Sequence, residues 1–193
     1  MTAPGLGPLG ALTQLWAKVD AFGARVDARM PGERACGEGC HDCCAPGLSV
    51  TTIEGEAIAA FVERATPAEQ TRLREALARA AGDRCAALDA RGACTIYEAR
   101  PIVCRSHGLP IRVAGPERRL PMIDACPKNF VGRDLDGLER ECVLDQATLS
   151  TMLGAIDAAF ADASGACRGL RAPLAALLAD LLGEADSEPP AGP

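Results

Sequence analysis

The strongest constraint on this chain is a run of four cysteines within nine residues, Cys36-Gly-Glu-Gly-Cys40-His-Asp-Cys43-Cys44. Their neighbours are Gly, Glu, His and Asp, which do not suit cysteines buried as small apolar side chains. The short spacers would let one flexible loop wrap several sulfur atoms around a metal centre. Because the segment lacks helical or strand periodicity, we expect a loop whose shape a bound ion fixes.

Adjacent Cys43 and Cys44 are harder to fit to a single ion, because neighbouring side chains generally diverge along the backbone. Two metal centres would account for the pair, and so would one ligand beside a thiol that binds no metal. A disulfide between the two neighbours is a competing interpretation. The spacing alone leaves these alternatives open.

A second group of cysteines follows among Gly and Pro residues. It consists of Cys85, Cys94, Cys104 and Cys126. Four plus four sulfur atoms would fill two tetrahedral sites, or would hold one four-iron cluster with thiols to spare. We expect Cys142 and Cys167, which lie outside both groups, to be ordinary thiols.

Length and composition narrow the class of protein. A chain of 193 residues suits one domain, or a domain with helical arms, so its core does not require cross-links. No secretory signal is visible at the start, and no apolar run approaches the ~18 residues of a membrane span. We therefore expect a cytoplasmic protein that does not enter a membrane, where clustered cysteines more often bind metal than form disulfides.

The charge pattern does not predict binding to nucleic acid. The formal net charge is −6, and the basic residues are scattered along the chain instead of gathered on one segment. Four Phe, one Tyr and one Trp offer few rings on which bases could stack. We expect no nucleic-acid partner.

Apolar periodicity and capping residues predict a mainly α fold. The expected helices cover residues 9–30, about 52–64, 67 to about 81, about 146–163, and a last segment opened by Pro173. Thr51, Thr66 and Asp145 are the expected N-caps. Short strands at 111–113 and 120–123 predict at most a small β-hairpin. The fold class is therefore a helical scaffold around a loop-rich cysteine centre.

The same pattern predicts an organisation along the chain. Residues 1–33 form an N-terminal helix, and residues 34–134 form a cysteine-cluster domain with a helical hairpin. Residues 135–184 add C-terminal helices that pack on that domain. Residues 185–193 have no large apolar side chain and are expected to be a disordered tail.

The segment from Cys36 to about Pro127 resembles the CxxCxxCC cysteine-cluster family, whose domain is described as zinc- or iron-chelating. The most specific part is Cys94-Thr-Ile-Tyr-Glu-Ala-Arg-Pro-Ile-Val-Cys104-Arg105, which is similar to the family's second signature. This chain has three residues between Cys36 and Cys40 where the family name implies two. The resemblance implies metal ligation by eight cysteines: Cys36, Cys40, Cys43, Cys44, Cys85, Cys94, Cys104 and Cys126.

Other residues near the cysteines are candidate binding groups. Tyr97, Arg100 and Arg105 could bind a carboxylate or phosphate of a cofactor or substrate; the alternative is that the arginines donate to loop carbonyls or to sulfur and that Tyr97 packs. His107, three residues after Cys104, is a candidate nitrogen ligand for a metal, and His41 is a weaker one. The alternative for both histidines is that the cysteines alone complete the coordination.

We therefore predict a metal-binding protein that holds zinc or an iron–sulfur cluster of the 4Fe-4S type. A structural zinc domain would have another protein as its partner. An enzymatic role stays open, because a class of methyltransferases acting on protein lysines carries a similar motif, with an iron–sulfur cluster. A redox enzyme, or a thiol redox or metal-delivery protein, is a further alternative, which the Cys43-Cys44 pair would support.

Overall fold

Helices are the main secondary structure of the residues that the structure describes. The computed structural model describes residues 7–37, 39–80, 82–114 and 121–183. In these residues α-helices dominate, and each strand is only two or three residues long. The mainly α class predicted from the sequence is confirmed. The predicted tail of residues 185–193 lies outside the described residues.

None of the helices in the described residues is both long enough and apolar enough to cross a bilayer.

Backbone contacts divide the chain into two units. The first unit comprises Met1–Cys40 and Arg100–Gly169, and the second unit comprises His41–Ala99 and Leu170–Pro193. Each unit therefore combines segments that are distant in the sequence. The division predicted from the sequence, into residues 1–33, 34–134, 135–184 and 185–193, stays a prediction.

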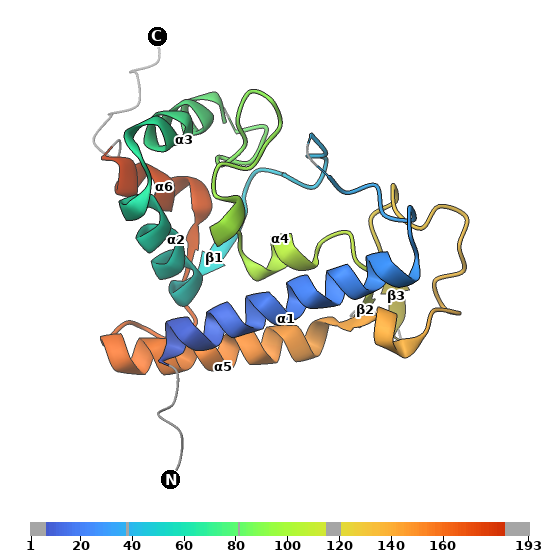
Figure 1. Cartoon of the computed structure of the whole chain (residues 1–193). Helices are drawn as coiled ribbons and strands as arrows, with labels where there is room; N and C mark the ends of the chain where they lie inside the picture. The colour runs from blue at the N-terminus through green and yellow to red at the C-terminus, as the bar shows by residue number, and fades with distance from the viewer. Residues whose placement is uncertain (1–6, 38, 81, 115–120, 184–193) are drawn as a thin grey trace. The chain divides into compact units, whose positions relative to one another are not determined.

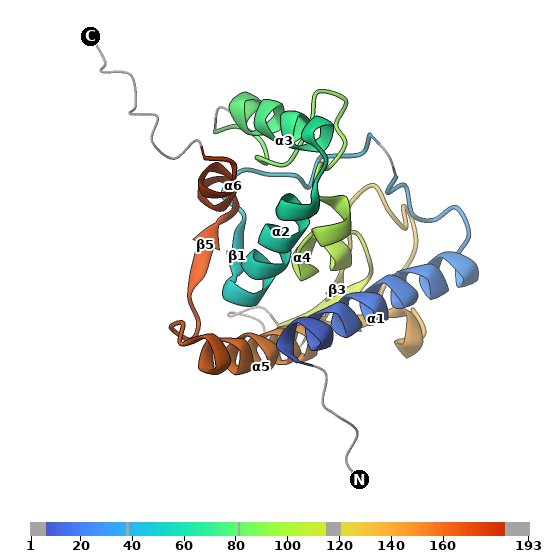
Figure 2. The same ribbon diagram turned by 60° about the vertical axis from the view of Figure 1, so that its left-hand side comes forward.

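The first unit is built on two long helices, α1 (Pro8–Arg29) and α5 (Gln146–Ser164). They lie alongside each other in both views (Figure 1, Figure 2), and the short helix α4 (Ile102–Ser106) also packs on α1. The apolar residues that α1 buries include Leu12, Leu15, Val19, Phe22 and Val26, whereas Leu9 near its start is 40% exposed. The predicted N-cap of α5 is confirmed, because the Asp145 carboxylate accepts from the Thr148 N–H at 2.8 Å.

A small sheet completes the first unit. Strands β2 (Ile111–Val113) and β3 (Met122–Asp124) pair antiparallel, with Val113 opposite Met122. They form the predicted hairpin; its turn and Leu120 lie in residues 115–120, outside the described ranges. The two-residue strand β4 (Leu144–Asp145), which follows the 3-10 turn η2 (Arg140–Cys142), adds to β2 in parallel. So short a strand shows no periodicity, and sequence analysis did not predict it.

The second unit contains helices α2 (Thr52–Arg64), α3 (Pro67–Arg79) and α6 (Leu174–Leu182) and the 3-10 turn η1 (Tyr97–Ala99). The predicted caps of α2 and α3 are confirmed. The Thr51 N–H and hydroxyl donate to Glu54 Oε2 at 3.1 and 3.0 Å, and Thr66 bonds to Glu69 in the same way at 2.8 Å. Each cap orients the start of its helix.

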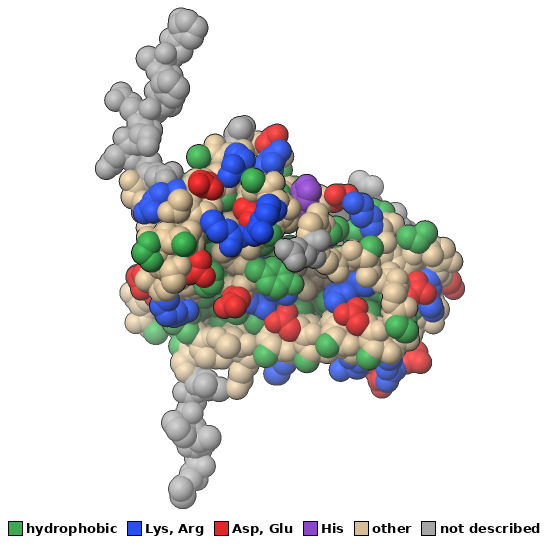
Figure 3. Space-filling view, turned by 45° about the horizontal axis from the view of Figure 1, so that its top comes forward, with side chains coloured by type: hydrophobic (Ala, Val, Ile, Leu, Met, Phe, Trp, Pro, Cys, Tyr) green, Lys and Arg blue, Asp and Glu red, His purple; other side chains and the backbone are tan. Residues whose placement is uncertain are grey.

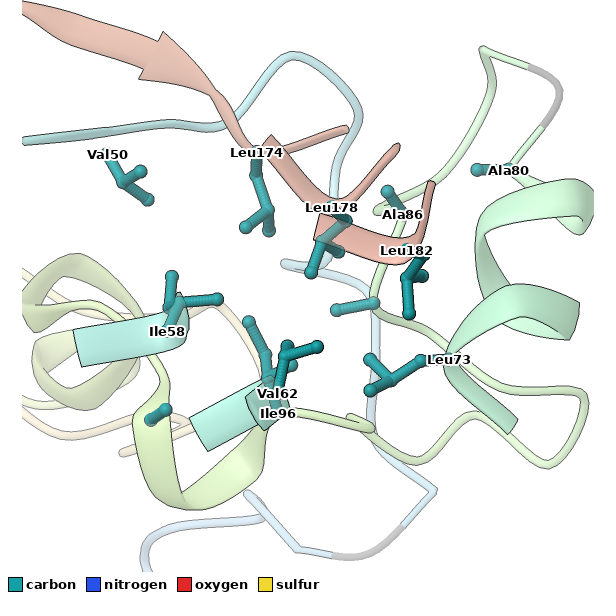
Figure 4. Packing of buried hydrophobic residues seen from close by; sticks show 12 residues of the cluster. Val50, Ile58, Val62, Leu73, Ala80, Ala86, Ile96, Leu174, Leu178 and Leu182 are labelled. Carbon is teal, nitrogen blue, oxygen red and sulfur yellow. The ribbon is translucent and has the colours of Figure 1, made fainter. Parts of the chain in front are cut away.

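Strands β1 (Ser49–Thr51) and β5 (Arg171–Pro173) pair antiparallel and bring α6 to α2 and α3. Apolar side chains from these elements converge in one core (Figure 4). Its members include Val50, Ile58, Val62, Leu73, Ile96, Leu174, Leu178 and Leu182. Cys85 and Cys94 pack against this core, so the segment that carries them is anchored.

Charged side chains of both signs are interspersed on the face shown in Figure 3. The exposed ion pairs of the first unit include Arg168 with Asp162 at 2.5 Å and Arg29 with Glu141 at 2.7 Å. Exposed pairs of this kind contribute little to the free energy of unfolding.

Candidate metal centre

The second unit brings two cysteine segments together. The Cys85 N–H donates to the Cys44 carbonyl at 3.0 Å, which joins the Cys43-Cys44 pair to the segment that begins at Cys85. Cys94 stands opposite Leu88 in an antiparallel bridge, so the chain turns back toward Cys85. Four thiols, Cys43, Cys44, Cys85 and Cys94, are therefore neighbours.

Asp89 organises the turn between Cys85 and Cys94. Its carboxylate accepts from the backbone N–H groups of Arg91 and Ala93, both at 2.9 Å, and from Arg72 Nη2 at 2.7 Å. The residue is only 7% exposed. The bond from the Ala93 N–H and the Arg72 guanidinium hold the pKa of Asp89 down at about 2. The turn is thus shaped by charge-assisted bonds as well as by the core.

The surroundings of Cys44 and Cys85 raise the pKa values of their thiols and so disfavour ionisation. Burial raises the pKa of Cys44 to about 12, with further contributions from Cys43, Cys85 and Cys94. Burial also raises the pKa of Cys85. A bound cation would stabilise the thiolate form of these cysteines, so the donor set fits zinc or iron. Binding of the metal would release the thiol protons.

His41 lies beside the same turn. A Cβ built on Gly92 would stand 2.8 Å from His41 Nδ1, so a larger residue at position 92 would displace the imidazole. Gly92 also has a φ of 78°, which favours glycine. The structure therefore places this histidine next to the cysteine turn of the second unit, while its ligation stays a prediction.

The first unit brings Cys36 and Cys126 to one glycine. A Cβ built on Gly108 would lie 2.7 Å from Cys36 Sγ and 3.9 Å from the Cys126 Cβ. Asn129 joins them, because its Nδ2 donates to the Gly108 carbonyl at 2.6 Å and to Cys36 Sγ at 3.2 Å. Cys40 and Cys104 belong to the same unit.

Helix α4 carries Cys104 and is tied to α1 by the next residue, Arg105. The Arg105 guanidinium stacks on the Trp16 ring at 4.3 Å, donates from Nη1 to Asp20 at 2.5 Å and from Nε to the Arg100 carbonyl at 3.0 Å. Cys104 itself is exposed. Arg105 thus fixes the helix while the thiol beside it faces solvent.

The remaining candidates differ in their surroundings. Arg100 pairs with Asp20 at 3.3 Å in the first unit. His107 is exposed at the end of α4, and Tyr97 of the second unit is 60% exposed on η1. Cofactor or substrate binding by Tyr97, Arg100 and Arg105, and ligation by His107, stay predictions.

All ten cysteines are free thiols, so no disulfide joins Cys43 to Cys44. Cys142 is buried and Cys167 is exposed. Within the ranges that the structure describes, no three His, Cys, Asp or Glu side chains are already arranged to hold an ion. Ligation by the eight cysteines stays a prediction.

Clustered cysteines of this kind are the donor set that metal-chelating proteins use. Residues 35–126 match the model of the CxxCxxCC family, described as “Putative zinc- or iron-chelating domain”. This match confirms the resemblance drawn from the sequence, and its span includes all eight clustered cysteines. Searches of curated proteins and of solved structures found no match. The match therefore supports chelation of zinc or iron by this segment of the chain.

Sequence reasoning missed Asp89, Gly108 and Asn129. Asp89 and Gly108 resemble many other loop residues, and only the contacts reveal them. Asn129 offered a signal, since it is the only asparagine of the chain and stands three residues after Cys126. A single buried amide beside a cysteine often completes a hydrogen-bond network.

Replacing Asp89 with asparagine tests its role in the turn. Asparagine keeps an oxygen for the two N–H groups but loses the charge that Arg72 and the backbone stabilise. The folded pKa of Asp89 is about 2 against an ordinary 3.8, so its carboxylate stabilises the fold above pH ~4. That contribution, about 2 kcal/mol, is lost as the pH falls through 3.8 toward 2.

We expect the difference in free energy of unfolding between wild type and Asp89→Asn to shrink from about 2 kcal/mol at pH 5 to near zero at pH 2. Urea unfolding at each pH measures it. Asp83→Asn is the matched control, because Asp83 is exposed and pairs with the exposed Arg84 at 3.4 Å. A difference that stays constant with pH would contradict this account.

Proposed function

We propose that this chain is a metal-binding protein that holds zinc or a 4Fe-4S cluster through cysteine thiolates. The proposed ligands are Cys36, Cys40, Cys43, Cys44, Cys85, Cys94, Cys104 and Cys126. The observation that carries the proposal is the meeting of Cys43 and Cys44 with Cys85 and Cys94 in the second unit. Four thiolates are a donor set of both structural zinc sites and four-iron clusters.

The anchoring of these thiols supports a ligand role. Cys85 and Cys94 pack against the core of the second unit, and Asp89 fixes the turn between them. The Cys85–Cys44 backbone bond holds the other segment in place. A group of thiols held this close gains stability when a divalent cation offsets the mutual repulsion of its thiolates.

The division of the cysteines supports two centres. The second unit contains Cys43, Cys44, Cys85 and Cys94, and the first unit contains Cys36, Cys40, Cys104 and Cys126. Each group thus combines two thiols of the first cysteine run with two later thiols. This grouping differs from that along the sequence, where the first four cysteines and the last four form separate runs. We keep His107, also of the first unit, as a candidate nitrogen donor there.

The consequence for biological role depends on the metal. Zinc would supply structural rigidity and would make another protein the expected partner, whereas a cluster would supply one-electron chemistry. Whichever metal is bound, Arg105 would support the centre of the first unit by fixing α4, which carries Cys104. Ten free thiols suit a reducing compartment such as the cytoplasm.

Metal analysis of protein purified without oxygen tests the proposal. We expect either two zinc ions per chain and no colour, or stoichiometric iron and sulfide with the brown absorption of a cluster. Thiol titration should show the eight cysteines protected until a chelator or acid removes the metal. Ten fully reactive thiols and less than one metal per chain would refute the proposal.

A further inference from the structure

Both polar atoms of the Asn129 side-chain amide are hydrogen-bonded. Its Oδ1 accepts from the Ala35 N–H at 2.9 Å, and its Nδ2 donates to the Gly108 carbonyl at 2.6 Å and to Cys36 Sγ at 3.2 Å. The residue is only 4% exposed. A flipped amide would set its oxygen against the Gly108 carbonyl and its nitrogen against the Ala35 N–H, so the partners fix which atom faces the sulfur.

Gly108 leaves the space that this contact requires. A Cβ there would stand 2.7 Å from Cys36 Sγ and 2.9 Å from Asn129 Nδ2, and the residue has a φ of 85°. Asn129 is also tied to the other cysteine of the pair, because its N–H donates to the Cys126 carbonyl at 2.8 Å. One buried residue therefore contacts Cys36 by its side chain and Cys126 by its backbone.

We propose that Asn129 is a positioning residue of a metal centre in the first unit, holding Cys36 Sγ beside Cys126 through an N–H···S hydrogen bond. The inference rests on the proposed function, because it requires a metal on Cys36. Groups that orient a metal ligand in this way strongly affect affinity. Asn129 lies outside the matched residues 35–126. Its hydrogen bond would position Cys36 for the metal even though three residues, and not two, separate Cys36 from Cys40.

The hydrogen bond can be observed directly in the full chain loaded with ¹¹³Cd²⁺, a spin-½ ion that binds thiolates. We expect scalar coupling between a cadmium nucleus and a side-chain amide proton of Asn129, transmitted through Cys36 Sγ. A proton–cadmium correlation spectrum would show it as a cross-peak that disappears in Asn129→Asp.

Cadmium affinity gives the second readout. Asn129→Asp keeps an oxygen for the Ala35 N–H, but its carboxylate cannot donate to sulfur. We expect the affinity of the first unit to fall about 10- to 100-fold and that of the second unit to stay unchanged. Gln14→Glu is the matched control, because it makes the same amide-to-acid change at an exposed position of the same unit.

A cycle with Cys36→Ala separates positioning from a general structural role. If Asn129 acts through Cys36, then Asn129→Asp changes the affinity less than twofold when Cys36 is absent. The same 10- to 100-fold loss in that background would overturn the inference and leave Asn129 a purely structural residue.

Two further outcomes distinguish this inference from the proposed function. If both units bind cadmium, yet Asn129 shows no coupling and Asn129→Asp alters the affinity less than twofold, the inference alone is overturned. If the chain binds no cadmium, the proposed function fails and the inference fails with it.

Discussion

Replacing Cys85 with serine is expected to weaken metal binding in the second unit and to destabilise the metal-loaded chain. Its zinc should be lost to a limiting amount of competing chelator that leaves wild type loaded. Serine preserves the backbone bond to Cys44 but replaces a thiolate by a neutral hydroxyl. Binding of structural zinc supplies roughly 10–16 kcal/mol over four ligands, so one thiolate accounts for about 3 kcal/mol, or about two orders of magnitude in affinity. Zinc per chain and thermal unfolding measure the effect.

Cys167→Ser is the matched control, because Cys167 is an exposed thiol outside both groups. It should change neither metal content nor stability, whereas Cys40→Ser and Cys104→Ser should lose the metal of the first unit. With a chelator present, Cys85→Ser and wild type should unfold at similar temperatures. Full metal retention by Cys85→Ser would refute its assignment as a ligand.

Replacing Gly108 with alanine is expected to destabilise the first unit strongly and to displace Cys36. The backbone there has a φ of 85°, and left-handed backbone costs a residue with a side chain about 1–2 kcal/mol. The new methyl group would stand 2.7 Å from Cys36 Sγ, and overpacking of this kind costs about 1–3 kcal/mol more. We expect a total loss of about 2–5 kcal/mol in urea unfolding, together with weaker metal binding.

Gly132→Ala separates the two causes. Gly132 belongs to the same unit and has a φ of 77°, but a Cβ there would meet no atom within 4 Å. It should lose only the backbone contribution, about 1–2 kcal/mol, and should keep its metal. Equal losses in the two variants would show that the contact with Cys36 and Asn129 does not matter.

Local features were predictable for a local physical reason. Helix periodicity acts between residues three or four apart, and a cap such as Thr66 with Glu69 acts over three. The helices beginning near Thr51, Thr66 and Asp145 therefore lie where the sequence analysis expected them. Strands β1, β4 and β5 escaped prediction because pairs such as Val50 with Ala172 join distant segments.

The candidate site shows the same limit. The cysteine spacing and the family resemblance predicted which thiols could bind metal. The family match supports chelation of zinc or iron by residues 35–126, while the ligand residues themselves stay a prediction. They did not predict that Cys43 and Cys44 would join Cys85 and Cys94, or that Asp89 would shape the turn between two of them. These relations depend on loop closure between segments far apart in the chain.

The sequence by itself determined the helical class, the positions of the main helices and the clustering of the cysteines along the chain, because each follows from residue type and short-range spacing. Only the tertiary structure decided how the cysteines divide between two units and which buried residues hold them. Asn129 illustrates the reason: its partners Ala35, Cys36 and Gly108 are remote in sequence, and they meet only when the chain has folded.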